Sequence, residues 1–226
     1  FTYFYSLKNL ASSRQKLQSF YLEIRSPISD VKSPDATWLS YALTPYLREK
    51  LDFNDGWIWS QVKEGHLGLP PGETAEGFSF ESRGLPSIVY CYVRPYTRLR
   101  GASEELPEEL HAAIDRVAWK IPNGPTVGPT SPPERIEPIT FLNRMTEMVD
   151  ISVQQGWVIS LDAGTEMKKS LGDAITALKH GDKSKASVLL GALLERVDQE
   201  NQRALLTEAY VLFKFNLQFL IRQLED

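Results

Sequence analysis

The feature that most constrains this chain is a change in the spacing of its apolar residues near the proline-rich run at residues 121–133. Before the run, apolar and aromatic residues mostly alternate with polar ones, which is typical of β-strands. After it they recur every three or four residues, which is typical of α-helices. The prolines restrict the run to extended backbone. The sequence therefore predicts an α+β chain of two modules joined by a stiff linker, an interpretation favoured over a PxxP ligand for another protein.

The first module, residues 1–102, is predicted to be an antiparallel Ig-like β-sandwich, because its short strands are separated by turn-forming clusters. We expect the strands at residues 2–8, 17–25, 57–62, 76–82 and 87–94. In the second strand, Phe20 and Leu22 share one face, which is expected in the core. Tyr21 and Glu23 share the other face, which is expected in water.

Residues 103–137 are expected to form a short helix followed by the linker. Pro107 suits the first turn of a helix, and the acidic residues after it oppose the positive end of the helix dipole. An apolar stripe follows at helical spacing, made of Leu110, Ile114 and Val117.

The second module, residues 138–226, is predicted to be an antiparallel bundle of about four helices, because four segments carry apolar stripes at helical spacing. Gly181 is expected to end the second helix in a left-handed conformation, and Asp182 to cap the third. Thr207 is expected to cap the fourth helix, whose apolar residues cover two faces. That helix is therefore expected either at the centre of the bundle or in contact with another module or chain.

Composition excludes several classes of function. The formal net charge is -4, and acids and bases are mixed along the chain, which disfavours nucleic acid as a partner. No apolar stretch approaches the roughly 20 residues that cross a bilayer. Cys91 is the only cysteine, so no intrachain disulfide can form, and in its strand it is expected to act as a small buried hydrophobe.

No catalytic or cofactor motif is recognisable in the sequence. The three histidines, His66, His111 and His180, lie in different predicted elements, and no zinc, phosphate-binding or nucleophile-elbow motif occurs. We therefore predict that the chain is not an enzyme and binds no cofactor.

One loop is a weak candidate for calcium. Asp52, Asn54 and Asp55 bring three oxygen-bearing side chains together before a strand, although the spacing of an EF-hand loop is missing. The same residue types also form ordinary turns, because their side chains hydrogen-bond to nearby backbone. A turn is the preferred interpretation.

The aromatic residues allow two interpretations. Trp38, Trp57 and Trp59 could form a carbohydrate-binding platform, since flat rings stack on sugar faces while polar neighbours bind hydroxyls. Trp57 and Trp59 are two residues apart and so lie on one face of a strand, which a sandwich could equally bury in its core. Exposed rings would favour sugar binding, and buried rings would favour a core.

Parts of the sequence resemble known domain types. The helical half resembles the small FIMAH or FIVAR-like modules appended to bacterial extracellular proteins, at residues 181–186, 193–197 and 208–216. The first half looks like uncharacterised β-sandwich domains of secreted bacterial proteins, at Tyr3, Tyr5 and residues 71–73, 77–80 and 82–86. The resemblance implies a helical module that accompanies catalytic or adhesive domains without being catalytic itself.

These observations predict a secreted or surface-associated bacterial protein that works by binding or assembly. The expected partners are other protein chains, including a second copy of itself, or a glycan. The chain begins at Phe1 rather than methionine, which is consistent with a mature secreted protein or with a trimmed one. Two alternatives stay open, namely a carbohydrate-binding module that uses the sandwich aromatics and a hydrolase with an unrecognised site.

Overall fold

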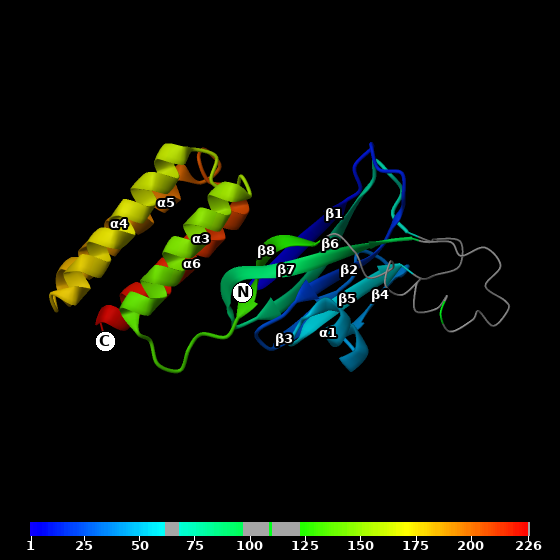
Figure 1. Ribbon diagram of the computed structural model, residues 1–226, viewed down its shortest axis with the longest axis horizontal. Coiled ribbons are helices and arrows are strands. Elements are labelled where there is room, and N and C mark those ends of the chain that lie inside the picture. Colours follow the sequence, from blue (N-terminus) through cyan, green and yellow to red (C-terminus); the bar gives the residue numbers. More distant parts are fainter. Residues whose placement is uncertain (62–67, 97–108, 110–122, 226) are drawn as a thin grey trace. The chain divides into compact units, whose positions relative to one another are not determined.

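The computed structural model describes residues 1–61, 68–96, 109 and 123–225 and has the α+β class expected from the sequence, with antiparallel sheets and helices (Figure 1). Its residues divide into two compact units. The first consists of Phe1–Gly84 and Val89–Ser131, and the second of Leu85–Ile88 and Pro132–Asp226. Each unit has a core of its own.

The first unit is built on two sheets. The three-stranded sheet has the order β1-β6-β3, with β1 at Thr2–Lys8, β6 at Thr74–Ser82 and β3 at Ile28–Lys32. The five-stranded sheet has the order β4-β5-β2-β7-β8, with β4 at Trp38–Ala42, β5 at Gly56–Gln61, β2 at Leu17–Glu23, β7 at Leu85–Pro95 and β8 at Asn123–Thr130. Pairing is antiparallel in β1 with β6, β3 with β6, β4 with β5, and β2 with both β5 and β7.

A cluster of aromatic rings joins the two sheets. Phe78 of the three-stranded sheet lies 5.7 Å from Phe20 and 5.8 Å from Trp59 of the five-stranded sheet, between ring centroids. Phe80, two residues along β6, faces the same way and is fully buried with Phe78 and Trp59. The alternation of apolar and polar residues in the sequence therefore places large rings on the two facing surfaces.

The other face of β2 is also buried, so the expectation that Tyr21 and Glu23 lie in water is wrong. Tyr21 is 1% exposed and packs with Ile58 and Leu51. Leu51 belongs to the helix α1 (Pro45–Leu51), which the sequence analysis did not foresee. Because a helix covers this face, both sides of the central strand are enclosed, and strict alternation of core and solvent breaks down.

The predicted linker is partly wrong, because residues 123–130 form strand β8 at one edge of the five-stranded sheet. Pro129 and Ser131 flank Arg25 across a parallel bridge, since Arg25 N donates to Pro129 O at 3.1 Å and Ser131 N donates to Arg25 O at 3.0 Å. Proline enforces extended backbone, which suits an edge strand as well as a linker. The helix expected from Pro107 onward lies outside the described residues.

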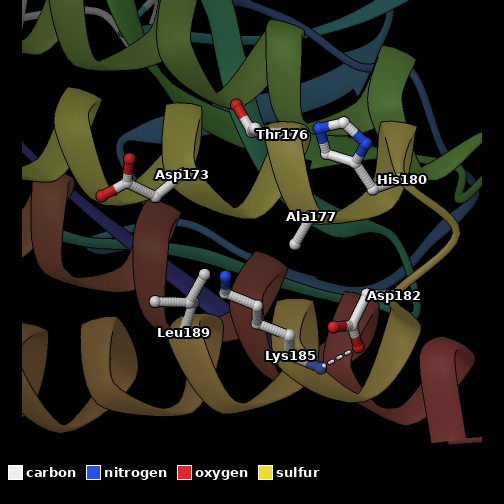
Figure 2. Close-up of a pocket in the computed structure, with 7 residues that line it drawn as sticks. All are labelled: Asp173, Thr176, Ala177, His180, Asp182, Lys185 and Leu189. Carbon is white, nitrogen blue, oxygen red and sulfur yellow. Dashed lines mark hydrogen bonds between the residues drawn. The ribbon is translucent and has the colours of Figure 1, made fainter.

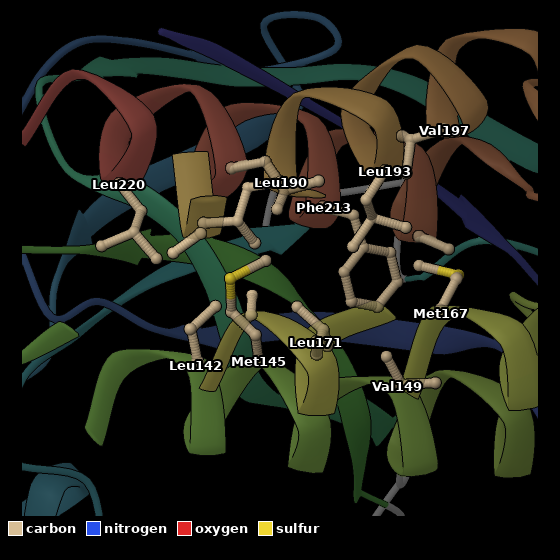
Figure 3. Close-up of a cluster of buried hydrophobic side chains, with 14 of the residues drawn as sticks. Leu142, Met145, Val149, Met167, Leu171, Leu190, Leu193, Val197, Phe213 and Leu220 are labelled. Carbon is tan, nitrogen blue, oxygen red and sulfur yellow. The ribbon is translucent and has the colours of Figure 1, made fainter. Parts of the chain in front are cut away.

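The second unit contains the four long helices α3 (Pro138–Gln154), α4 (Leu161–Lys179), α5 (Lys183–Glu200) and α6 (Thr207–Glu225). Their apolar stripes meet in one core. Figure 3 shows side chains from all four helices converging there, including Met145, Leu171, Leu190 and Phe213, each no more than 1% exposed. These segments were all expected from the sequence, because helical spacing is a local signal.

The ends of these helices follow from particular residues. Gly181 has a φ of 77°, which a glycine adopts without steric cost, and it closes α4 as expected. The Asp182 carboxylate accepts a hydrogen bond from Lys185 N at 2.9 Å and caps α5. Thr207 does not act as the cap of α6, because Tyr210 N donates to Leu206 O at 2.9 Å and Thr207 is already helical.

Helix α6 is buried on more than one side, as its two apolar faces predict. Phe213 and Leu217 lie in the helical core, while Asn216 is 3% exposed but is not part of that core. The Asn216 amide donates to Leu212 O at 2.7 Å and to Pro86 O at 2.8 Å. Pro86 belongs to the same unit as the helices, so this buried polar group is satisfied within the unit.

Substitution of Gly128 tests whether residues 123–130 form a strand in the sheet. A Cβ at Gly128 would lie 2.6 Å from Val89 Cγ2, so Gly128→Ala should force β8 away from β7. We expect a loss of unfolding free energy of about 1–3 kcal/mol, as for other overpacked sites, measured by urea denaturation. Gly124→Ala is the matched control, because nothing lies within 4 Å of its Cβ. Equal stability of both variants would contradict the placement of β8.

Candidate functional site

The three tryptophans named as sugar-binding candidates have different surroundings. Trp38 is 4% exposed and packs edge-on against Phe78, with ring centroids 5.0 Å apart. Trp59 is fully buried, and its Nε1 donates to Lys32 O at 3.0 Å. Trp57 is half-buried and lines a hollow. The structure therefore does not bring the three rings together on one exposed surface.

The hollow beside Trp57, here called the sheet-end pocket, has a volume of about 710 Å³. It forms where the connection from β2 to β3 approaches the beginning of β5. Ala42, at the end of β4, is the cross-strand partner of Trp57 and contributes to the lining. The residues that line it are Ile24, Arg25, Ser26, Pro27, Ile28, Ala42, Asn54, Asp55, Gly56, Trp57 and Ser131.

The charges around the sheet-end pocket are balanced. Arg25 makes two hydrogen bonds to the buried carboxylate of Glu23, at 2.7 Å and 2.9 Å. Asp55 lies 3.3 Å from the Arg48 guanidinium, and its Oδ1 also accepts from Gly56 N at 2.8 Å. Each charged group at the pocket therefore already has an opposite charge beside it, which lowers the affinity expected for an ion.

Trp57 carries an orphaned polar atom. Its Nε1 is buried and has no hydrogen-bond partner among the described residues, and the same holds for the hydroxyl of Thr130, the neighbour of Ser131. Buried donors and acceptors are nearly always paired, since an unpaired one costs about 1–3 kcal/mol. Trp57 thus lines the pocket, and its buried Nε1 is a donor without an acceptor.

The three residues of the calcium candidate form a turn. Asp52 ends α1 with a φ of 56°, and Asn54 and Asp55 lead into β5. The Arg48 guanidinium pairs with Asp55 and lies 3.5 Å from Asn54 O, so a positive group already occupies this loop. The turn, which the sequence analysis preferred, accounts for all three residues, and the weak calcium candidate stays untested. In the described part of the chain, no three His, Cys, Asp or Glu side chains gather as a metal site.

A second hollow, of about 480 Å³, lies between α4 and α5 near their connection (Figure 2). Two of its polar side chains hydrogen-bond to the backbone of these helices. The Thr176 hydroxyl donates to Gly172 O at 2.9 Å, and Asp182 caps α5. Figure 2 shows Asp173 and His180 on one side and Lys185 and Leu189 on the other. These side chains sit on exposed turns of the two helices, and the hollow follows from their short connection.

The shifted pKa values arise in the core of the first unit and on the surface of the helices. Burial raises the pKa of the Tyr3 and Tyr5 hydroxyls far above the usual range, and both hydroxyls donate to backbone carbonyls. Burial likewise raises the pKa of Cys91 to about 11. On the helices, the hydrogen bond from Lys214 lowers the pKa of Asp198. Tyr3 and Cys91 also raise the pKa of Tyr5 electrostatically, and the shifts in this group are due mainly to burial. The shift of Asp198 is due mainly to its hydrogen bond with Lys214.

Of the three histidines, only His180 lies within the described residues, and the positions of His66 and His111 fall outside them. Sequence reasoning missed Arg25 and Ser131 as pocket residues. Ser131 belonged to the predicted linker, and only the pairing of β8 brings it to the sheet-end pocket.

Comparison with known proteins adds no assignment. No protein-family model matches the chain, and no curated protein is significantly similar to it. Within the described ranges, every helix is too short or too polar to cross a membrane.

The pKa of Cys91 predicts slow thiol chemistry. With a pKa of about 11, the side chain is almost wholly protonated at pH 8, and the thiolate is the reactive form. We expect Cys91 in the folded protein to react with a chromogenic disulfide at least about tenfold more slowly than an exposed thiol. The rate should rise with pH throughout the range from about 7 to 9. The urea-unfolded chain serves as control, and equal rates in both states would contradict the shielding of this half-buried thiol.

The Asp198 ion pair predicts a pH-dependent contribution to stability. Asp198 Oδ1 accepts from Lys214 Nζ at 2.7 Å and from the Tyr210 hydroxyl at 3.0 Å, which ties α5 to α6. Because the pKa of Asp198 is lowered in the folded state, its contribution is present above the unfolded pKa of about 3.9 and is lost as pH falls through the folded value. Asp198→Asn should lower the unfolding free energy at neutral pH by about 0.2–1 kcal/mol, as for exposed pairs.

Urea denaturation at neutral and at strongly acidic pH measures this effect. The difference between Asp198→Asn and the parent should vanish in acid. Asp173→Asn, which changes an exposed carboxylate of α4, should show a smaller difference at neutral pH. A difference for Asp198→Asn that persists unchanged in acid would refute the assigned role.

Proposed function

We propose that this chain is a non-catalytic protein of the bacterial cell exterior that works by binding and assembly. In this proposal the two sheets form an Ig-like β-sandwich that presents the interaction surface. The four long helices form an antiparallel bundle that serves as a spacer or docking unit. The partner is another protein chain, and the variant that we favour is pairing with a second copy through β1.

The observation that carries this proposal is the exposure of Phe4 on an edge strand. Among the described strands, β1 pairs only with β6 and so lies at the edge of the three-stranded sheet. Phe4 on this strand is 73% exposed. An open edge of seven residues with an exposed aromatic ring offers both backbone hydrogen bonds and apolar area to an added strand.

The edges at β3 and β8 are less suited to strand addition. In β3, Asp30 has a φ of 48° and the register with β6 shifts between Ser29 and Lys32, so the backbone is irregular. In β8, Pro125 and Pro129 have no backbone N–H to donate. These are the devices by which sheets avoid unwanted pairing. The register of β1 with β6 also shifts, between Tyr5 and Ser6, but the extra residue there, Gly77, lies on β6, and β1 contains no proline.

The distribution of charge supports a non-catalytic role. Among the carboxylates of the described residues, Asp198 is the one whose pKa is shifted. Pairing with Lys214 on an exposed helix surface lowers this pKa. A hydrolase with an unrecognised site remains an alternative. It would require carboxylates with raised pKa values gathered in one pocket.

The extracellular, bacterial setting rests on the resemblance to FIMAH or FIVAR-like modules and to β-sandwich domains of secreted proteins. Carbohydrate binding is the second candidate function. The burial of Trp38 and Trp59 argues against a platform of three rings. The position of Trp57 in a pocket favours sugar binding at that one ring.

Phe4→Lys tests assembly through β1. The wild-type chain should form dimers as its concentration rises, measured by sedimentation equilibrium. Phe4→Lys should weaken the dimer at least about tenfold, because a charged side chain on the edge replaces apolar contact area with like-charge repulsion across the pair.

Leu10→Lys is the matched control, since Leu10 is 62% exposed but lies in a turn outside the strands. It should leave the dimer intact. A wild-type chain that stays monomeric at high concentration, or equal weakening by both variants, would rule out assembly through β1.

A further inference from the structure

We propose that the sheet-end pocket is a binding site for a neutral oligosaccharide, with Trp57 as its central contact. Sugar binding would then use one tryptophan ring and one pocket, instead of a platform of three rings. It does not depend on assembly through β1, because Phe4 does not line the pocket.

The size and lining of the pocket fit a small polar ligand. Its volume of about 710 Å³ lies within the roughly 300–1,000 Å³ that small-ligand sites occupy. The Trp57 ring, Pro27 and Ile28 supply apolar surface, and Asn54, Asp55 and the serines supply polar groups. A sugar ring has one apolar face of C–H groups and a rim of hydroxyls, so it matches an aromatic wall with polar neighbours.

The hydrogen-bonding groups also match hydroxyls. Trp57 Nε1 is a buried donor without an acceptor, so a sugar oxygen would accept from it once a small turn of the indole opens this atom to the pocket. The exposed side chain of Asn54 can both donate and accept. A hydroxyl can likewise both donate and accept, so it can satisfy either kind of partner.

The balance of charge selects a neutral ligand. The pairs Arg25 with Glu23 and Arg48 with Asp55 leave neither a free cation for a phosphate or uronic acid nor a free anion for an amine. An ion entering the pocket would have to compete with these partners, whereas a neutral polyhydroxyl compound would not.

A neighbouring hollow gives room for more than one sugar unit. It has a volume of about 430 Å³ and shares Ser26, Pro27 and Ile28 with the sheet-end pocket. The two hollows therefore meet at this segment, and Glu81 and Arg83 line the far side of the second. We expect affinity to rise with the length of the oligosaccharide.

The test is binding of neutral cell-wall oligosaccharides to the full chain. An array that includes cellohexaose, xylohexaose and chitohexaose identifies the best probe, and calorimetry then measures its affinity. Trp57→Phe removes the indole donor and should weaken binding about tenfold or more, as expected when a buried hydrogen bond is lost. Asn54→Ala, an exposed loop substitution, should weaken binding without loss of stability.

Trp38→Phe is the matched control, because it makes the same change in a ring that does not line the pocket. It should leave the affinity unchanged. In the wild-type protein, the indole N–H resonance of Trp57 should shift on titration with the probe, a readout that needs no variant to fold. Phe4→Lys should bind the probe as the parent does, which separates this site from assembly.

Three results would overturn the proposal. The first is an absence of binding to every neutral oligosaccharide on the array. The second is binding that leaves the Trp57 resonance in place or is unaffected by both Trp57→Phe and Asn54→Ala. The third is a preference for anionic over neutral oligosaccharides.

Discussion

The packing of aromatic rings between the two sheets is the interaction on which the rest of the first unit depends. Phe20 and Trp59 from one sheet pack against Phe78 and Phe80 from the other, and the single cysteine forms no intrachain disulfide that could share this task. Rings of this size bury about 150–250 Å² each, so a few of them supply much of the apolar burial that a small sheet pair needs. The outer strands, α1 and the sheet-end pocket are then arranged around a core that is already fixed.

The helical unit could be predicted in much greater detail than the sheets. The stripes that contain Leu171 and Leu190 repeat within one segment, and the glycine and aspartate at 181 and 182 act on their immediate neighbours. Helices depend on contacts three or four residues apart, which a sequence displays directly. The start of α6 was misplaced by one residue, since Leu206 and not Thr207 precedes the first helical turn.

The sheets depended on pairings that the sequence does not display. Tyr21 alternates with core residues, but its burial is due to α1, which lies more than twenty residues later in the chain. The prolines near residue 125 fit either a spacer or an edge strand, and the pairing of β8 with β7, together with the bridge from Thr130 to Arg25, distinguishes the two. Among the candidate site residues, Trp57 could be named from its type and spacing. The sequence could not show that Trp57 is separated from Trp38 and Trp59, because all three lie on the same face of the sheet. Only the end of that face, where Trp57 lies, is open.

The irregular backbone of β3 has a consequence for the size of any assembly. A filament of added strands needs two regular edges on each sheet, one to receive a strand and one to offer itself. In β1 every residue pairs in turn with β6, and the extra residue at its register shift lies on β6, whereas in β3 the left-handed Asp30 lies on the edge strand itself and interrupts its row of backbone groups. Pairing of two copies through β1 would use up this edge in both, so growth through the three-stranded sheet would end at a closed pair with two-fold symmetry. The kink in one short strand would thus keep this sheet from extending into a filament.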